Sequence, residues 1–349
     1  MRVAGSTGGA RLTRLAIQEP NPISCVVAMM SPTEHLTVPD PDTAAAPSRL
    51  CVKVVANARS GTVLAKGAAA FAAEVTRAFE AAGASVEVCL VEGEHVAAAV
   101  AESIASPDQR VVIAGGDGTL MRLLPILSKA ERPIGLLPLG TVNLLGKDLG
   151  FTGDVDHDVA LAIGTHVRRV NLARAGSVLF HSNMGLGILG RMAFEREEAR
   201  RRLPFSRILS FFWAATRTLM LARTLPIMME VDNAERHFHA DAILVTNNAF
   251  DDETLRRPEL DQELLEVHIV TAPRIQDRLA LALAILRGRW RSHAALRTVR
   301  CRSLRLERKG RRRTRVAVDG ELLRFRGMID VRCTDEFVEI FGAPPDKPA

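Results

Sequence analysis

The chain has 349 residues, of which 47% are hydrophobic and 25% charged, and it carries a formal net charge of +6. This length exceeds what one hydrophobic core usually organises, and the composition excludes a disordered or fibrous chain, so we expect globular domains. The longest apolar run lies near residues 279–286, far short of the ~18 residues that a membrane-spanning helix needs, so we expect no such helix.

The cysteines and the net charge indicate a cellular compartment and a kind of binding partner. The five cysteines are scattered and form no Cys-x-x-Cys pair. This pattern argues against a disulfide framework and a zinc site and favours a reducing, cytoplasmic compartment. The positive charge comes mostly from arginines in the second half and suits an anionic partner such as a phospholipid surface or a nucleotide, although a solvated basic surface is the alternative.

Residues 1–49 differ from the rest of the chain. Gly, Pro, Ser and Thr punctuate them, no hydrophobic periodicity holds, and the apolar core of a secretion signal is missing. We predict a disordered extension over 1–49 and a short tail over 344–349.

From Leu50 onward, strand-like and helix-like segments alternate. This pattern predicts an α/β domain over 50–169, in which helices cover both faces of a parallel sheet. Ligands on such sheets bind at the carboxyl ends of the strands, and the loops at Asn57, Gly115 and Gly140 all fall at such ends. The expected strands are 51–56, 85–91, 110–114 and 133–137, and the expected helices are 68–82, 95–106 and 120–127.

After about residue 170 short strands follow one another with turns between them. This texture predicts a mostly antiparallel β-sandwich domain over 170–343, and an alternative is that its C-terminal stretch returns to the first domain. Two basic helix-like segments, 191–223 and 278–302, interrupt the strands. The expected strands are 170–175, 177–182, 227–231, 242–246, 265–270, 303–307, 315–318 and 337–340.

The most informative segment is Gly-Gly-Asp-Gly-Thr at 115–119, which lies between an apolar strand and a helix. Glycines allow close approach of the backbone, and N–H groups at a helix N-terminus attract an anion. Asp117 inside this turn would repel a phosphate unless it holds a metal or handles a proton. The segment therefore indicates nucleotide-phosphate chemistry.

These segments together resemble the bacterial diacylglycerol kinase-like lipid kinases, which share a catalytic domain with sphingosine and ceramide kinases. The first loop, 57–61, is similar to the Asn-Pro-x-Ser-Gly loop of the family, with Ala58 in place of proline. The segments 114–119, 138–143, 183–187 and 319–321 resemble further motifs of the family, in the same order. The resemblance implies an α/β nucleotide-binding domain, similar to NAD kinase and phosphofructokinase, followed by a β-rich lipid-binding domain.

The resemblance also implies residue roles. Asp117 would orient magnesium or help deprotonate the substrate, and its structural alternative is a residue that caps the following helix. Glu321 would act as the general base, and its structural alternative is a residue of an exposed hairpin turn. Asp319 would support the turn before Glu321. Cys89 would border the nucleotide, and its alternative role is a small buried hydrophobe. The implied ATP-binding residues are Asn57, Ser60, Gly61, Cys89, Gly115, Gly116, Asp117, Gly118, Thr119, Leu120, Gly140, Thr141 and Asn143.

A second, structural magnesium site is implied at Asp261, with the carbonyls of Pro258 and Glu263 as further ligands. Gln262 stands where the family has glycine, which marks a divergent subgroup. His237 and His239 would project from one side of a strand, but a third ligand for zinc is not evident.

The sequence thus predicts an ATP- and Mg²⁺-dependent lipid kinase of phospholipid metabolism, which phosphorylates diacylglycerol to phosphatidic acid at the inner face of the membrane. A soluble-substrate kinase of the NAD kinase type and a non-catalytic nucleotide- or lipid-binding regulator are the alternatives. The basic run 308–313 is expected to be a hairpin loop, and no nucleic-acid partner is expected because no motif supports one. Whether the chain forms a homodimer is left open.

Overall fold

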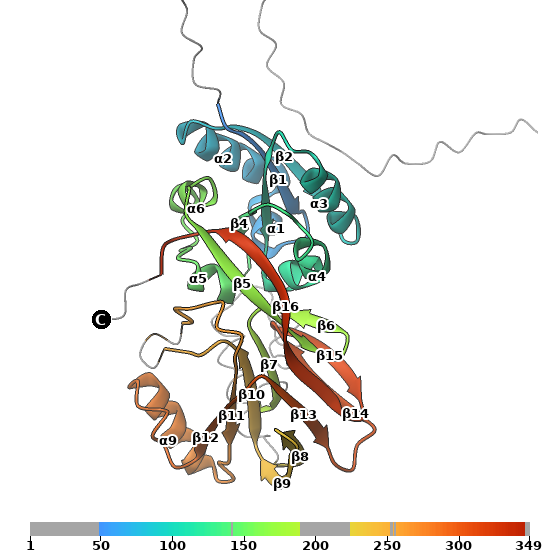
Figure 1. Cartoon of the computed structure of the whole chain (residues 1–349). Helices are drawn as coiled ribbons and strands as arrows, with labels where there is room; N and C mark the ends of the chain where they lie inside the picture. The colour runs from blue at the N-terminus through green and yellow to red at the C-terminus, as the bar shows by residue number, and fades with distance from the viewer. Residues whose placement is uncertain (1–48, 141, 189–223, 252–253, 255, 346–349) are drawn as a thin grey trace, which may run out of the picture.

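The computed structural model describes residues 49–140, 142–188, 224–251, 254 and 256–345. The predicted N-terminal extension, Thr141 and the basic segment 191–223 therefore lie outside the described residues. Figure 1 shows an upper part built of helices around a sheet and a lower part built mainly of strands.

The upper part holds a four-stranded parallel sheet with the order β2-β1-β3-β4. Its strands are rich in valine and leucine, as expected for a sheet that is covered on both faces. The elements, in chain order, are β1 Cys51–Asn57, α1 Gly61–Lys66, α2 Ala68–Ala81, β2 Ser85–Val91, α3 His95–Ala105, β3 Arg110–Gly115, α4 Asp117–Leu127, β4 Gly135–Pro138, α5 Leu144–Asp148 and α6 Val155–Ala162.

Alternating side chains of β1 pack into two separate hydrophobic clusters. Val54 and Ala56 pack in a cluster with residues of α1, α2 and α6, whereas Val55 packs in a second cluster with residues of α3 and α4. Successive strand residues point to opposite faces, so one strand can serve both layers. The predicted α/β fold, with helices on both faces of a parallel sheet, is confirmed (Figure 1).

The lower part contains two six-stranded sheets with the orders β12-β11-β10-β7-β14-β15 and β6-β5-β16-β13-β8-β9, and their pairings are antiparallel. The predicted antiparallel β-rich second part is thereby confirmed. Its elements are β5 Val167–Ala175, β6 Val178–Phe180, β7 Asn183–Gly187, β8 Leu225–Val231, β9 Ala234–Ala240, β10 Ala242–Asn247, β11 Leu265–Val270, α9 Ile275–Leu286, β12 Leu296–Cys301, β13 Ser303–Arg308, β14 Arg313–Val318, β15 Glu321–Arg326 and β16 Ile329–Phe341.

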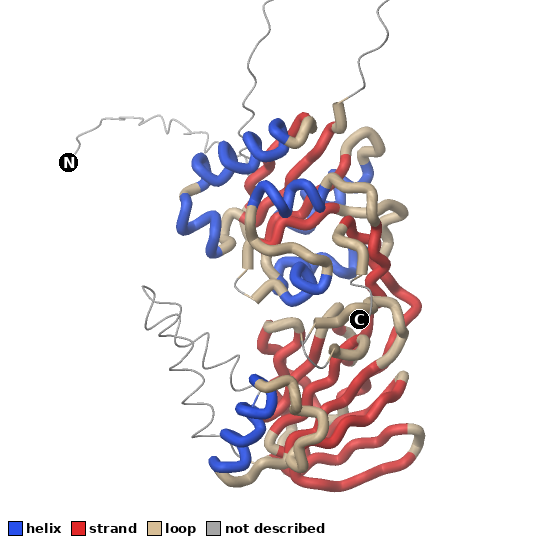
Figure 2. Tube along the Cα trace, turned by 90° about the vertical axis from the view of Figure 1, so that its left-hand side faces the viewer, coloured by secondary structure: helices blue, strands red, loops and turns tan. Residues whose placement is uncertain are grey.

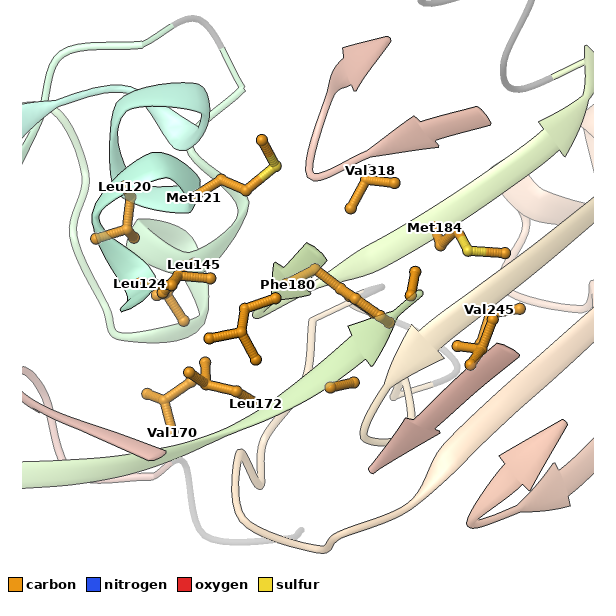
Figure 3. Close-up of a cluster of buried hydrophobic side chains, with 14 of the residues drawn as sticks. Leu120, Met121, Leu124, Leu145, Val170, Leu172, Phe180, Met184, Val245 and Val318 are labelled. Carbon is orange, nitrogen blue, oxygen red and sulfur yellow. The ribbon is translucent and has the colours of Figure 1, made fainter. Parts of the chain in front are cut away.

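One hydrophobic cluster joins the two parts. Side chains from α4 and α5 of the upper part lie in it beside side chains from both lower sheets (Figure 3). Burial of apolar area is the main favourable term in folding, so this shared cluster couples the two parts. Its labelled members are Leu120, Met121, Leu124, Leu145, Val170, Leu172, Phe180, Met184, Val245 and Val318.

The C-terminal strand β16 also returns to the upper part. The N–H of Ile134, just before β4, donates to the carbonyl of Glu339 over 3.0 Å, and the N–H of Phe341 donates to the carbonyl of Ile134 over 2.9 Å. The chain therefore crosses between the parts twice, once through β5 and once through β16 (Figure 1). The boundary near residue 169 stays a prediction.

The expected helix over 278–302 is wrong in its second half. Helix α9 ends at Leu286, Gly288 follows with a φ of 66°, and Leu296–Cys301 forms β12, which pairs with β11. Glycine in the left-handed region ends a helix readily, and the β-branched Thr298 and Val299 suit a strand. Among the described helices, none is long and apolar enough to cross a bilayer.

Candidate functional site

The candidate site lies where the order of the parallel sheet reverses. The chain runs from β1 outward to β2 and then back across to β3, so β1 and β3 are neighbours whose following helices leave toward opposite faces. Such a point opens a crevice at the carboxyl ends of the strands. Here Asn57 ends β1 and donates from Nδ2 to Oγ1 of Thr119, 3.0 Å away, in the first turn of α4.

The glycine loop after β3 packs directly on the loop after β4. A Cβ at Gly116 would lie 3.0 Å from Cα of Gly140, and the N–H of Leu139 donates to the carbonyl of Gly115 over 2.9 Å. A side chain at either glycine would push the two backbones apart. The Gly-Gly pair is therefore required for this contact, and Gly116 also forms the N-cap of α4.

The loop after β1 lies beside the loops after β3 and β4. Ser60 caps α1 by accepting a hydrogen bond from the N–H of Val63, and the hydroxyl of Thr62 donates to the carbonyl of Leu139 over 2.9 Å. The three loops that the sequence predicted as ligand-binding thus meet at one edge of the sheet. What they bind is not part of the structure, so the ATP-binding role of their residues stays a prediction.

Asp117 is the charged group of this edge. Burial raises its pKa above the ordinary value, and the carboxylate of Asp319 adds to the increase. His181 and the backbone N–H groups of Asn143 and Leu144, at the start of α5, act in the opposite direction. The pKa of the Asp117 carboxyl group is therefore raised, chiefly by burial, and shifted pKa values of this kind are common at reactive sites.

Asn143 faces the same small hollow as Asp117. The hollow is lined by Asp117 and Asn143 together with the glycine loop, Leu120, Leu136, Pro138 and Gly146. Asn143 has a left-handed φ of 49°, and its Nδ2 donates to the carbonyl of Gly140, whereas its Oδ1 is buried without a hydrogen-bond partner. A buried acceptor without a partner is costly and suits a ligand, a metal or a water molecule in the hollow.

Glu321 from the second part of the chain reaches the glycine loop. A Cβ at Gly118 would lie only 2.1 Å from Oε1 of Glu321, so the carboxylate rests directly on the Cα of Gly118. On its other side, Oε2 lies 3.9 Å from Nη2 of Arg122. The structure thus brings Glu321, Gly118 and Asp117 together, although they are about 200 residues apart in sequence.

A two-residue hairpin turn holds Glu321 in place. Asp319 and Gly320 both have positive φ, 44° and 84°, between the paired residues Val318 and Glu321. This is the turn expected for a tight hairpin. The Asp319 side chain, however, is buried and accepts hydrogen bonds from the N–H groups of three successive residues, His181, Ser182 and Asn183, over 2.9–3.0 Å.

His181 also contacts Asp319 directly. Its Nε2 lies 3.4 Å from Oδ2 of Asp319, within the range of an ion pair but without hydrogen-bond geometry. Both side chains are fully buried. Asp319 therefore connects the β14–β15 turn to the segment that enters β7, and it fixes the direction from which Glu321 approaches the loop.

Two of the expected ATP-binding residues are not placed at this edge by the described structure. Cys89 is 4% exposed in β2 and packs in the hydrophobic core, which is the environment of a small buried hydrophobe. Thr141 lies outside the described residues. The remaining residues of the expected set lie in the three loops or in the first turn of α4.

The expected second metal site gains no support from the geometry. The Pro258 carbonyl accepts a hydrogen bond from Nη2 of Arg168 at 2.7 Å, so a cation there would meet a guanidinium charge. Asp261 is exposed, and the Glu263 carboxylate binds Arg302. No cluster of three or more His, Cys, Asp or Glu side chains suited to a metal occurs in the described part of the chain. The metal site at Asp261, Pro258 and Glu263 therefore stays a prediction.

Two arginines of the region were not singled out from the sequence. Arg122 stands beside Glu321, and Arg257, which is 1% exposed, binds the Asp148 carboxylate through Nε and Nη2 at 2.9 and 2.6 Å. The same Arg257 donates to the carbonyls of His181 and Asn247. It therefore fastens the end of α5 to the β-rich part, and no spacing in so arginine-rich a chain distinguishes it.

Part of the chain is similar to known lipid kinases. Residues 51–175 match the diacylglycerol kinase catalytic domain, so the resemblance is confirmed over that segment. A diacylglycerol kinase of Staphylococcus haemolyticus is 27% identical over 201 residues, which are 56% of this chain and 58% of that protein. A probable lipid kinase YegS-like protein of an Enterobacter species is 26% identical over 141 residues, 39% of this chain and 46% of that protein.

The chain spans about half the length of these curated relatives. Similarity of fold extends further. The crystal structure of a putative diacylglycerol kinase from Bacillus anthracis superposes with a TM-score of 0.67 at 18% identity, and it covers 87% of this chain and 98% of its own. The expected two-part architecture is therefore a known fold.

Proposed function

We propose that the chain is an ATP-dependent lipid kinase that transfers the γ-phosphoryl group to the hydroxyl of diacylglycerol and forms phosphatidic acid. The observation that carries this proposal is the contact of the Glu321 carboxylate with Gly118, because it joins a candidate base to a phosphate-binding loop. The match of residues 51–175 to the diacylglycerol kinase catalytic domain, and relatives named diacylglycerol kinase and lipid kinase, support the same reading.

The glycine loop supplies the anion site. The first N–H groups of a helix have no partner within the helix, and those of α4 follow directly on Gly116. Together with the positive end of the helix dipole they suit the phosphates of ATP. Because Gly116 and Gly140 carry no side chains, the backbone of the two loops would contact the nucleotide.

In this proposal Glu321 accepts a proton from the attacking hydroxyl. A general base must lie within hydrogen-bond reach of that hydroxyl while the phosphate is held in line. Because Glu321 comes from the β-rich part and Gly118 from the α/β part, a lipid hydroxyl that reaches Glu321 also reaches the loop. Arg122, whose Nη2 lies 3.9 Å from Oε2 of Glu321, would stabilise the negative charge that develops on the transferred phosphoryl group.

Two oxygen donors that line the hollow, the carboxylate of Asp117 and the unpaired Oδ1 of Asn143, fit a divalent cation such as Mg²⁺. When bound, Mg²⁺ would neutralise phosphate charge. Asp117 would then favour its charged form, because a nearby cation counteracts the effect of burial. A cytoplasmic protein that reaches its substrate at the inner face of the membrane is part of this proposal.

The test uses radiolabelled ATP, Mg²⁺ and vesicles that contain diacylglycerol. Labelled phosphatidic acid from the wild type, reduced at least about a hundredfold in Glu321→Gln, is the expected result. Glu131→Gln, which changes an exposed carboxylate at the opposite end of the sheet, is the matched control and should keep full activity. A different labelled lipid would retain the mechanism and change the substrate. Labelled NADP from NAD, or bound nucleotide with no product from any lipid extract, would refute the proposal.

A further inference from the structure

Helix α9 presents an apolar stripe to solvent. Ile275, Leu279 and Leu283 are spaced by four residues and therefore lie on one face, and they are 45%, 55% and 45% exposed. Surface helices of globular proteins normally bury such a stripe against the core. Here the stripe is turned outward over nearly the whole length of a 12-residue helix.

The opposite side of α9 is firmly attached to the β-rich part. Arg278, 8% exposed, lies 3.2 Å from Oδ1 of the fully buried Asp241 and donates from Nε to the carbonyl of Ala272 over 2.9 Å. The other oxygen of Asp241 accepts from the N–H of Ala272 over 2.7 Å, and Leu281 of α9 is buried as well. Because these contacts fix the rotation of the helix, the stripe faces outward as a consequence of the fold, not of a loosely held helix.

The charges around the stripe are positive. Arg274, Arg287 and Arg289 are exposed at the two ends of the helix, and no described residue forms an ion pair with any of the three. The one acidic residue within α9, Asp277, accepts a hydrogen bond from the N–H of Arg274 and so caps the helix. Figure 2 shows α9 on the outer side of the strands, away from the parallel sheet. An apolar stripe between unpaired arginines is complementary to a surface that is apolar beneath and anionic on top.

We propose that the outer face of α9 docks on an anionic phospholipid surface, with Ile275, Leu279 and Leu283 in the acyl boundary and the arginines among the head groups. A helix of this kind lies in the plane of the interface, and each arginine near the surface strengthens the attraction. The inference deepens the proposed function, since it supplies the membrane contact that a lipid kinase needs. Its physical basis, however, is independent of catalysis.

The experiment measures co-sedimentation of the full chain with vesicles of phosphatidylcholine, with and without phosphatidylglycerol, in the absence of ATP. We expect binding that requires phosphatidylglycerol and weakens with salt. The double variant Leu279→Gln/Leu283→Gln should bind about tenfold more weakly or worse. Arg287→Gln and Arg289→Gln should each weaken vesicle binding about fivefold.

Met328→Gln is the matched control, because Met328 is 46% exposed in the turn before β16 and lies outside the stripe. It should bind vesicles as the wild type does. Unchanged binding by the double leucine variant would overturn the inference. So would a clear fall in its melting temperature, which would show that another part of the chain covers the stripe, or conversion of a wild-type dimer to a monomer, which would assign the stripe to a second copy.

Docking and catalysis fail separately in this design. A wild type that binds anionic vesicles but phosphorylates no lipid would leave the docking inference standing and refute the kinase proposal. A wild type that phosphorylates a dispersed short-chain diacylglycerol but does not bind vesicles would support the kinase proposal and refute the docking inference. If both hold, the double leucine variant should lose activity on vesicles and keep it on the dispersed substrate.

Discussion

Replacing Gly118 by alanine tests the contact between the glycine loop and Glu321. The new Cβ would lie 2.1 Å from Oε1 and 2.9 Å from Cδ of Glu321, and an ordinary contact begins at 3.4 Å, so the carboxylate must retreat by about 1.3 Å, the difference between 3.4 and 2.1 Å. A misplacement of about 1 Å in a reacting group costs roughly a hundredfold in rate. We therefore expect kcat for lipid phosphorylation to fall about a hundredfold in Gly118→Ala.

Stability should change little in the same variant. Gly118 lies in the first turn of α4 with an ordinary φ, alanine is the better helix former by about 1 kcal/mol, and the displaced group is the end of a flexible side chain. The assay pairs steady-state kinetics with thermal unfolding.

Gly116→Ala provides the contrast. Its Cβ would meet backbone, the Cα of Gly140 at 3.0 Å, which cannot rotate away, so both ATP binding and stability should suffer. If Gly118→Ala keeps wild-type kcat, the position of Glu321 against the loop is irrelevant to the rate and its assignment as base is refuted. A stable Gly118→Ala enzyme with a strongly reduced kcat is the result that the geometry requires.

Three further predictions concern the carboxylates of Asp319, Asp117 and Glu266. Asp319→Ala should lower the free energy of unfolding by about 3 kcal/mol or more, because three buried N–H groups lose their acceptor, and denaturant titration measures this. Asp117→Asn should abolish activity yet raise stability near neutral pH. The pKa of Asp117 is raised in the folded state. Its contribution to the free energy of unfolding is therefore present below the ordinary value of 3.8 and is lost as pH rises through the folded pKa. Glu266→Gln should cost about 3–5 kcal/mol, since it leaves Arg291 and Arg300 beside an uncharged buried group.

The pH dependence separates the last two variants. Burial disfavours the charged form of Glu266, but hydrogen bonds and charge from His268 and Arg291 outweigh burial and hold its pKa well below the ordinary 4.5. Its stabilisation is thus present above that value and lost as pH falls through the folded pKa. As pH falls through the acid range, the melting temperature of each variant should approach that of the wild type. Asp117→Asn should start above the wild type, and Glu266→Gln should start below it. Parallel curves at all pH values would contradict both assignments, and an Asp319→Ala protein as stable as the wild type would contradict the third prediction.

Much of the first part of the chain could be predicted from local patterns. The strands at 51–56 and 85–91 and the helices at 68–82 and 95–106 agree with the structure to within about two residues, because buried strands and Ala-rich helices are specified by side-chain periodicity. The same reasoning placed three loops at the carboxyl ends of strands, and the sheet order then brings those loops together. Short elements without periodicity, such as α1 and α5, were missed because one or two turns of helix carry little pattern.

Tertiary contacts decided the rest. The segment after Gly288 was expected to be helical, but its residues 296–301 form β12, because pairing with β11 and the β-branched Thr298 and Val299 outweigh the helix preference of its arginines. The burial of Arg257 against Asp148, two residues separated by 109 positions, has no local signature at all. The exposure of the α9 stripe is likewise a property of packing, since the sequence shows an amphipathic helix but not which side the protein covers.

The sequence by itself therefore determined the parallel sheet, the glycine loop and the presence of a tight turn at 319–320, because each depends on residues that are neighbours along the chain. Only the tertiary structure decided that Glu321 rests on Gly118 and that Asp319 is buried beneath the turn. Those contacts join segments about 140–200 residues apart, and their geometry follows from how two sheets and a shared core pack, which no local spacing encodes.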